Sequence, residues 1–207
     1  MSSLAIFGAS GHGRVVADIA RCVGWRQIAF FDDAYPDVRN NGKWNVIGDF
    51  RDLINRTSEF DAVIVAIGAN STRLKVQRKL GGIGFNLATL VHPGAIVAKD
   101  VSIGCGAVVM AGAVINSDTV ICEACIVNTS AIIDHDCNIA AGAHISPGAA
   151  LAGGVSVGSG SWVGIGACVK QLVRIGASVV IGAGSVVLRD VPDGETVVGN
   201  PARSLLK

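Results

Sequence analysis

The second half of the chain carries an aliphatic residue at every sixth position, without a change of phase. A period of six fits neither the 3.6-residue period of an α-helix nor the two-residue alternation of a simple strand. It predicts a parallel β-helix built from hexapeptides, three of which close one triangular coil of about 18 residues. The period alone leaves the hand of the coil open. The sixteen positions are Val97, Ile103, Val109, Ile115, Ile121, Val127, Ile133, Ile139, Ile145, Leu151, Val157, Val163, Val169, Ile175, Ile181 and Val187.

Composition excludes several classes of protein. The 207 residues have a formal net charge of +1, and the basic side chains are scattered along the sequence, which argues against nucleic-acid binding. Residues 138–169 contain no charged side chain, but they are rich in Gly, Ser and Ala and keep the six-residue phase. We interpret them as β-helix and not as a membrane span. Six cysteines without a signal peptide indicate free thiols in a cytoplasmic protein.

Residues 1–90 predict a small Rossmann-like α/β domain that precedes the β-helix of residues 91–207. A short apolar strand runs into a loop with glycines at Gly8, Gly11 and Gly13, and apolar residues at helical spacing follow. Such a loop lets backbone N–H groups approach a phosphate. The spacing G-x-x-G-x-G differs from the dinucleotide fingerprint, so it favours a phosphorylated ligand over NAD. A tight turn without a ligand is the alternative.

Polar residues also follow the next two predicted strands. Asp32 and Asp33 end strand 27–31, and a glycine and an amide follow strand 61–67, before a helix 71–80 that carries Arg73. Because ligands of open α/β sheets bind beyond the carboxyl ends of the strands, we expect these groups to face one crevice. The alternative is that the two aspartates only form a solvated turn, in which this residue type is common. Gly81 to Gly84 should break the helix, and a last strand should cover 86–91.

The corners of the repeat otherwise carry small residues such as Gly, Ala and Ser, but one segment reads Asp134-His135-Asp136. An imidazole between two carboxylates can act as a general base. The alternative is an exposed corner histidine without a catalytic role. Gly153 lies 18 residues later, and therefore about 5 Å above His135, where its N–H can stabilise an oxyanion. His144 lies half a coil away, so a site that uses both histidines requires two subunits of a closed cyclic oligomer.

The cysteines and histidines do not predict a metal site. Cys122 and Cys125 form one CxxC, but no second pair completes a tetrahedral site, and Cys125 and Cys137 fall where the repeat places small buried residues. The four histidines lack the spacing of a catalytic zinc site, which argues against a γ-type carbonic anhydrase.

Two features outside the histidine segment bear on assembly and ligand charge. The residues just before successive aliphatic positions are apolar too, which suggests self-association through an outer face. At the carboxyl end, Arg203 and Lys207 place positive charge that suits a ligand carrying phosphates. The apolar outer residues are Val108, Val114, Val120, Ile126 and Ile132.

The whole chain resembles the NeuD/PglD-type hexapeptide acyltransferases, and most closely the UDP-4-amino-sugar N-acetyltransferases of bacillosamine biosynthesis. The segments that carry this resemblance are 7–13, 31–33, 66–73, 128–130, 133–136, 146–148, 152–153 and 199–203. The resemblance implies a left-handed β-helix, a homotrimer, and acetyl-CoA in a groove between adjacent prisms. It also implies that the amino-terminal domain binds the UDP-sugar.

Residue roles follow from the same resemblance. His135 is similar to the catalytic base of the family, and Asp136 to its supporting acid, which is Glu in some relatives. Residues expected at acetyl-CoA are His144, Gly153, Ile165 and Ala183, the last of which is Gly in relatives. Residues expected at the nucleotide-sugar are Gly8, Ser10, Gly11, His12, Gly13, Asp32, Asp33, Ala66, Gly68, Asn70, Arg73 and Asn128.

The function expected on these grounds is acetyl transfer from acetyl-CoA to the C4 amine of a UDP-linked 4-amino-4,6-dideoxy sugar. His135 removes a proton in a direct attack, without a metal or a covalent intermediate. Two alternatives stay open at this point. One is a sugar O-acetyltransferase of the sialic-acid type, and the other is a non-catalytic β-helix scaffold with a nucleotide-binding domain.

Overall fold

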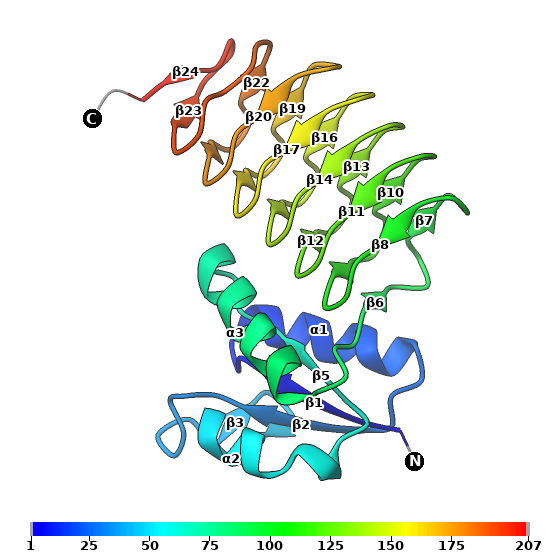
Figure 1. Ribbon diagram of the computed structural model, residues 1–207, viewed down its shortest axis with the longest axis vertical. Helices are drawn as coiled ribbons and strands as arrows, with labels where there is room; N and C mark the ends of the chain where they lie inside the picture. The colour runs from blue at the N-terminus through cyan, green and yellow to red at the C-terminus, as the bar shows by residue number, and fades with distance from the viewer. Residues whose placement is uncertain (1, 206–207) are drawn as a thin grey trace. The chain divides into compact units, whose positions relative to one another are not determined.

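The computed structural model describes residues 2–205 of the chain (Figure 1). The chain divides into two compact units, one that reaches to His92 and one that begins at Pro93.

The first unit contains a three-stranded parallel sheet in the order β2-β1-β5, with β1 (Ser3–Phe7) between β2 (Gln27–Phe31) and β5 (Ala62–Val65). Strands β1 and β5 are apolar and buried throughout, as expected for a sheet covered on both faces. One face packs on α2 (Phe50–Asn55) and α3 (Asn70–Ile83), which contribute Leu53 and Leu80 to the core. The remaining elements are α1 (Gly11–Cys22), β3 (Asn40–Asn41), β4 (Trp44–Asn45), a 3₁₀ turn (Thr57–Glu59) and β6 (Leu90–Val91).

Two predictions for this unit were wrong in detail. Helix α3 continues through Gly81 and Gly82, because a glycine without a side chain still adopts helical angles, and it ends at Gly84, whose φ is 104°. The strand expected over 86–91 is reduced to β6, and Leu87 makes only an isolated bridge to Val63.

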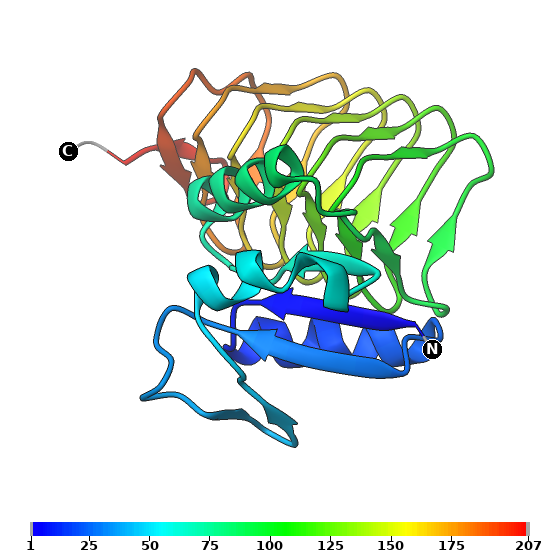
Figure 2. The ribbon, with the colours of Figure 1, turned by 60° about the horizontal axis from the view of Figure 1, so that its bottom comes forward.

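The second unit is a parallel β-helix in which residues 18 apart pair in register, as Ile133 does with Leu151. Its strands form three faces (Figures 1 and 2). Face 1 contains β7 (Ile96–Val97), β10 (Val114–Ile115), β13 (Ile132–Ile133), β16 (Ala150–Leu151), β19 (Cys168–Val169) and β22 (Val186–Val187). Face 2 contains β8 (Ser102–Ile103), β11 (Val120–Ile121), β14 (Asn138–Ile139), β17 (Ser156–Val157) and β20 (Arg174–Ile175). Face 3 contains β9 (Val108–Val109), β12 (Ile126–Val127), β15 (His144–Ile145), β18 (Trp162–Val163), β21 (Val180–Ile181) and β23 (Thr196–Val198), with β24 (Arg203–Ser204) antiparallel to β23.

The predicted aliphatic positions point into the prism. They are buried from Val109 to Val187, and only Val97 and Ile103, in the first coil, are partly exposed. Each buried side chain contributes about 1.5–3 kcal/mol relative to an exposed one. The first residue of each two-residue strand points outward, and this alternation generates one outward column on each face.

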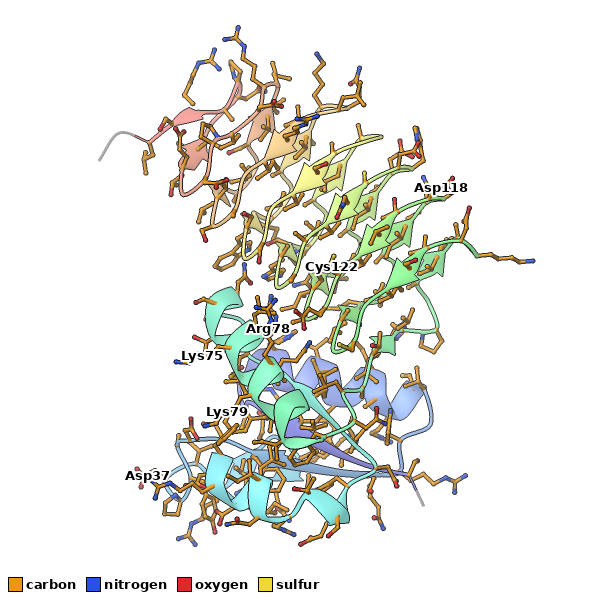
Figure 3. All side chains as sticks on the ribbon, in the orientation of Figure 1. Asp37, Lys75, Arg78, Lys79, Asp118 and Cys122 are labelled. Carbon is orange, nitrogen blue, oxygen red and sulfur yellow. The ribbon has the colours of Figure 1, made fainter. Side chains whose placement is uncertain are left out.

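The loops between the faces stack into three corners. The His corner joins face 1 to face 2 and contains residues 116–119, 134–137, 152–155, 170–173 and 188–190. The groove corner joins face 3 to face 1 and contains residues 128–131, 146–149, 164–167 and 182–185. The third corner joins face 2 to face 3 and contains residues 122–125 and 176–179. Asp118, at the His corner, and Cys122, at the third corner, lie at different edges of the β-helix (Figure 3).

Candidate active site

The His corner presents an imidazole paired with a carboxylate. His135 Nδ1 lies 2.7 Å from Asp136 Oδ2, and the two side chains are 59% and 64% exposed. The hydrogen bond that Nδ1 donates to Asp136, followed by the negative charge of Asp134, raises the pKa of His135 above its usual value. Because Nδ1 faces the carboxylate, it carries the proton of the neutral ring, and Nε2 is the atom that can accept one.

Asp134 holds this corner in shape. Its Oδ1 accepts hydrogen bonds from Asn116 Nδ2 at 2.8 Å and from the backbone N–H of His135 at 2.9 Å. These two bonds keep the pKa of Asp134 below its usual value. Thr119 Oγ1 donates to the Asp134 carbonyl at 2.8 Å. Asp134 therefore fixes the backbone of this corner, whereas Asp136 contacts the imidazole ring.

Gly153 provides the expected space beside the imidazole. A Cβ at Gly153 would lie 2.6 Å from both Cε1 and Nε2 of His135, so any side chain there would collide with the ring. The N–H of Gly154 donates to the His135 carbonyl at 2.9 Å, which locks the two coils in register. The predicted stacking of Gly153 on His135 is thus found in the structure.

A second feature is a mostly apolar hollow of about 360 Å³ on face 3 and the groove corner. It brings together three residues that the sequence associated with acetyl-CoA, namely His144, Ile165 and Ala183. Ser146 and Trp162, which the sequence analysis did not select, line the same hollow. Trp162 lies 18 residues after His144, so the coil arithmetic that found Gly153 would also have found it.

The ring of His144 is held from two sides within the β-helix. Trp162 stacks on it with ring centroids 5.3 Å apart and an interplanar angle of 13°. The indole Nε1 of Trp162 donates to Ser146 Oγ at 2.6 Å. Asn128 Nδ2 lies 3.0 Å from His144 Nε2, and the amide orientation is fixed because Asn128 Oδ1 accepts the Thr129 N–H at 2.8 Å. Asn128, which is expected at the nucleotide-sugar, thus contacts His144, which is expected at acetyl-CoA.

His135 and His144 do not meet within one chain. His135 belongs to the His corner, whereas His144 lies in β15 on face 3, beyond the groove corner. Face 1 separates the two corners. In one copy of the β-helix, His135 therefore lies at one border of face 1, and the hollow around His144 lies beyond the other border.

In the first unit, the glycine loop packs closely on the end of β5. Gly8 has a φ of 116°, and a Cβ there would lie 2.6 Å from the Ala66 carbonyl oxygen. A Cβ at Gly13 would lie 2.3 Å from the Gly8 carbonyl oxygen. The loop thus requires glycine at both positions for reasons of packing. Asp32 is bound to the loop itself, because its Oδ2 accepts the Ala9 N–H at 2.6 Å.

The other acidic and polar loop residues have structural partners. Asp32 Oδ1 also accepts the Ala34 N–H at 2.9 Å, and Asp33 Oδ1 accepts the Phe50 N–H at 3.3 Å. Ser10 stands at the N-cap position of α1 without a side-chain capping hydrogen bond, and its carbonyl accepts a hydrogen bond from Asn41 Nδ2 at 3.0 Å. Asn41 is 5% exposed and was missed, because only the tertiary fold brings it to this loop. Gly11 follows Ser10 as the first residue of α1.

His12 and Arg73 lie together on the same side of the loop. Burial, and then the positive charge of Arg73, lowers the pKa of His12 to about 4, so His12 is neutral at physiological pH. Its Nε2 is buried and makes no hydrogen bond to the described residues. Arg73 is 1% exposed and donates to the carbonyls of Ile67 and Gly68 and to Asn70 Oδ1 at 2.9–3.0 Å. Arg73 thus organises the loop after β5.

Cys125 and Cys137 are buried, as the repeat predicts, and burial raises the pKa of Cys137, which disfavours a thiolate. Within residues 2–205 no cluster of three or more His, Cys, Asp or Glu side chains is placed to hold a metal ion. In the same range, none of the helices has the length and apolar character needed to cross a membrane.

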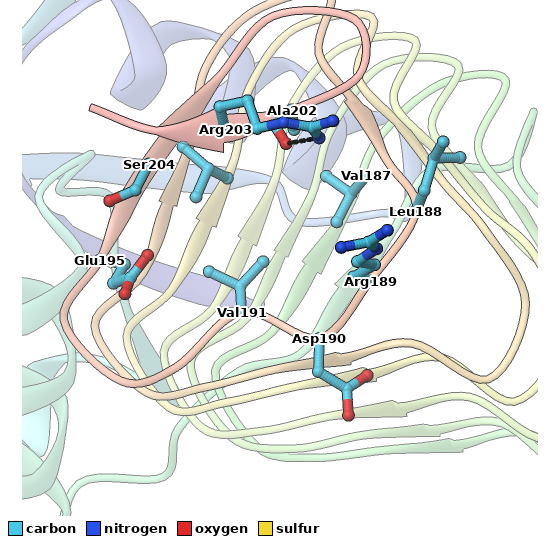
Figure 4. Close-up of a pocket in the computed structure, with 10 residues that line it drawn as sticks. Val187, Leu188, Arg189, Asp190, Val191, Glu195, Ala202, Arg203 and Ser204 are labelled. Atoms are coloured by element: carbon cyan, nitrogen blue, oxygen red, sulfur yellow. Dashed lines mark hydrogen bonds between the residues drawn. The ribbon is translucent and has the colours of Figure 1, made fainter. Parts of the chain in front are cut away.

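A further pocket, of about 220 Å³, lies at the carboxyl end of the β-helix (Figure 4). Its lining includes Arg189 and Arg203, together with Asp190 and Glu195. Arg203 Nη1 donates to the Ala202 carbonyl at 2.9 Å. The pocket places the positive charge of Arg203 near the last coil, as the sequence suggested, whereas Lys207 lies outside the described residues.

The first unit matches a known family. Residues 3–80 match the model of the PglD N-terminal domain. The UDP-N-acetylbacillosamine N-acetyltransferase of Bacillus subtilis is 39% identical over 116 residues, which is 53% of this chain and 52% of that protein. The matched region thus spans about half the length of this curated relative.

Two solved structures match almost the whole chain. PerB from Caulobacter crescentus, in complex with CoA and GDP-perosamine, is 40% identical, with a TM-score of 0.93 over 99% of this chain and 97% of PerB. The acetyltransferase domain of PglB from Neisseria gonorrhoeae, in complex with acetyl coenzyme A, is 42% identical, with a TM-score of 0.94 over 98% of both chains. This chain belongs to the PglD-type family of hexapeptide-repeat N-acetyltransferases. The expected α/β domain followed by a left-handed parallel β-helix is confirmed.

The pairing of His135 with Asp136 can be tested in this family member by titration. The carboxylate favours the imidazolium form, so replacing Asp136 with Asn should lower the pKa of His135 and move its midpoint to lower pH. The midpoint is measured from the pH dependence of the His135 ring signals in NMR spectra. Asp118→Asn, one coil lower at the same corner, is the control and should move the midpoint less. An unchanged midpoint in Asp136→Asn would mean that the hydrogen bond seen at 2.7 Å does not persist in solution.

Proposed function

We propose that this protein transfers the acetyl group of acetyl-CoA to the C4 amine of a UDP-linked 4-amino-4,6-dideoxy sugar. The observation that carries the proposal is the His135–Asp136 pair packed against Gly153, in which Asp136 contacts Nδ1 and the ring is 59% exposed. The amine acceptor is supported by the N-acetyltransferase relatives, one of which acts in bacillosamine chemistry and one of which was solved with a nucleotide-linked perosamine.

The reaction needs one proton acceptor and one donor to an oxyanion. The sugar amine attacks the thioester carbonyl carbon while His135 Nε2 removes a proton from the amine. Asp136 orients the ring and stabilises the imidazolium that forms. The Gly153 N–H, which donates to no group within residues 2–205, stabilises the tetrahedral oxyanion. Collapse breaks the carbon–sulfur bond, and the imidazolium returns the proton to the CoA thiolate.

The second half of the site comes from an adjacent copy in a homotrimer. Face 1 is bounded by the His corner on one side and the groove corner on the other. If three copies turn face 1 toward a common axis, the His corner of each copy meets the groove corner of the next. His135 of one copy then faces the hollow that contains His144, Ile165 and Ala183 in its neighbour.

The chemistry of face 1 supports this arrangement. Its outward column is apolar in every coil, and Ile96 and Ile132 are 68% and 45% exposed in a single copy. The outward column of face 2 instead contains Ser102, Asn138, Ser156 and Arg174. An exposed apolar column that spans six strands is typical of a protein–protein interface.

The first unit, residues 1–90, is proposed to bind the nucleotide. The glycine loop and the first N–H groups of α1 suit phosphates, since Gly8 and Gly13 allow the tight packing of the loop and Gly11 leaves its backbone open. His12 is neutral at physiological pH, so it would recognise the ligand by hydrogen bonding through its buried Nε2 and not by charge. The loop 66–70, which Arg73 organises, lies against the glycine loop at Gly8 and would complete the nucleotide site. On the acetyl-CoA side, Arg189 and Arg203 suit the phosphates of that co-substrate.

Acetyl transfer measured by release of free thiol tests the function. Wild-type protein is assayed with acetyl-CoA and UDP-, GDP- and dTDP-linked 4-amino sugars, and the UDP compound should give the highest kcat/KM. His135→Asn should lower kcat by about 10²–10⁴-fold because general-base help is lost. Asp118→Asn, at the same corner, should stay close to wild type. Thiol release with none of the sugars, in a folded protein, would contradict the proposal.

Assembly through face 1 makes a separate prediction. Ile132→Lys puts a charge into the proposed interface, so the trimer should dissociate and activity should be lost with it. Val120→Lys is the matched control, since Val120 is 41% exposed on the polar face 2 and should leave the trimer intact. Sedimentation equilibrium measures the oligomeric state of both variants, and thiol release measures their activity. A trimer that survives Ile132→Lys with full activity would exclude face 1 as the interface.

A further inference from the structure

One residue at the His corner has an unusual backbone. Leu172 has a φ of 63°, in the left-handed region, although its side chain is large and branched. The other non-glycine residues with positive φ are smaller or acidic, namely Asp118, Ala124, Ser130, Asp136 and Ser178. A side chain such as leucine disfavours this conformation sterically, and such strain persists where the surrounding structure or the function requires it.

The contacts that Leu172 makes within one chain do not compensate for the steric cost of its left-handed backbone. Its N–H donates to the Gly153 carbonyl at 3.0 Å, a backbone bond that any residue would make. Its Cδ2 lies 2.7 Å from the place where a Cβ of Gly154 would be, so the side chain lies over Gly154. Even so, Leu172 is 75% exposed. A leucine that is strained in its backbone and open to solvent gains most when a further apolar surface covers it.

The coil arithmetic shows what lies opposite Leu172 in the proposed trimer. A three-fold rotation about an axis parallel to the prism keeps every residue at its own height. With about 4.8 Å per coil of 18 residues, Leu172 lies only roughly 3 Å above the level of Trp162 and roughly 2 Å above that of Ile165. Trp162 and Ile165 are also large, apolar and open, at 45% and 56% exposed. Both line the hollow at the groove corner, which faces the His corner of the next copy.

We infer that Leu172 forms the second wall of the channel that receives the thiol-bearing arm of acetyl-CoA, opposite Trp162 and Ile165 of the adjacent copy. The reacting carbonyl belongs at Gly153, one coil below Leu172, and the arginines suited to phosphates lie on higher coils. The arm must therefore pass the level of Leu172, and its methylene groups match an apolar wall. The inference rests on the proposed function and adds a specificity-determining residue to it.

Leu172→Gly separates this role from a role in folding. Glycine accepts a φ of 63° without strain, so the variant should keep its melting temperature and its trimer. The KM for acetyl-CoA and the dissociation constant of CoA, measured by calorimetry, should each rise by about tenfold, as expected for the loss of one apolar contact. The kcat and the KM for the sugar should stay within about twofold of wild type, because neither the base nor the acceptor pocket is touched.

Ser178→Gly is the matched control. Ser178 has a φ of 55° and is exposed, but it lies at the third corner, away from the groove. This variant should change none of the four constants. Leu172→Asn, which tolerates the left-handed backbone but is polar, should weaken CoA binding as Leu172→Gly does.

Two results would overturn the inference. One is an unchanged affinity for CoA in a trimeric Leu172→Gly protein, which would show that the arm does not touch this side chain. The other is dissociation of Leu172→Gly into monomers, which would make Leu172 an assembly residue. If the wild-type trimer binds CoA but acetylates no sugar, the proposed function fails, whereas the calorimetric comparison still decides the role of Leu172.

Discussion

The in-register pairing of residues 18 apart is the constraint on which the rest of the β-helix depends. Backbone hydrogen bonds fix each coil on the next, and the rows of buried aliphatic side chains prevent a slip, because a shift by one residue would turn the core outward. The same pairing places every outward residue in a column. The chemistry of the protein is therefore decided by which side chain interrupts a column, and by what lies one coil above or below it.

His135 illustrates how this constraint produces a reactive group. Its coil places it under Gly153, whose lack of a side chain leaves Nε2 accessible. Asp136 has a φ of 58°, and in that conformation its carboxylate lies 2.7 Å from Nδ1. The proposed base, its proposed supporting acid and the proposed oxyanion donor thus come from one corner of two successive coils. A rigid scaffold is well suited to this task, because small displacements of such groups cost much of the rate.

The same scaffold prevents one chain from completing the site. A prism cannot fold back on itself, so the hollow around His144 and Trp162 stays beyond the far border of face 1. In the proposed trimer, acyl transfer depends on assembly, and the exposed apolar residues of face 1, of the hollow and at Leu172 have a common explanation. Each is exposed to water in a single copy, and the proposed cyclic arrangement of three copies would cover each of them.

Sequence periodicity was enough to predict the β-helix, the inward positions and the stacking of Gly153 on His135, because all three depend only on counting by six and eighteen. It did not predict that Arg73 is buried beneath the loop after β5, that Asp32 holds the glycine loop by a backbone bond, or that Asn41 joins them. Those contacts depend on how helices and loops pack in three dimensions. The end of α3 was also misplaced, since glycine weakens a helix without necessarily ending it. Trp162 was overlooked although the coil arithmetic points to it.

The central claim is that the active site is shared between copies, and mixed trimers test it most directly. One inactive variant, His135→Asn, lacks the base, and a second, Ala183→Trp, fills the hollow that should receive acetyl-CoA. Both variants are produced together and carry different tags, so that trimers containing both can be purified. In each purified mixed trimer, one of the three sites should combine an intact His corner from one copy with an intact hollow from the next, so activity should return to about one third of wild type. Mixed trimers that stay as inactive as either variant alone would contradict a shared site.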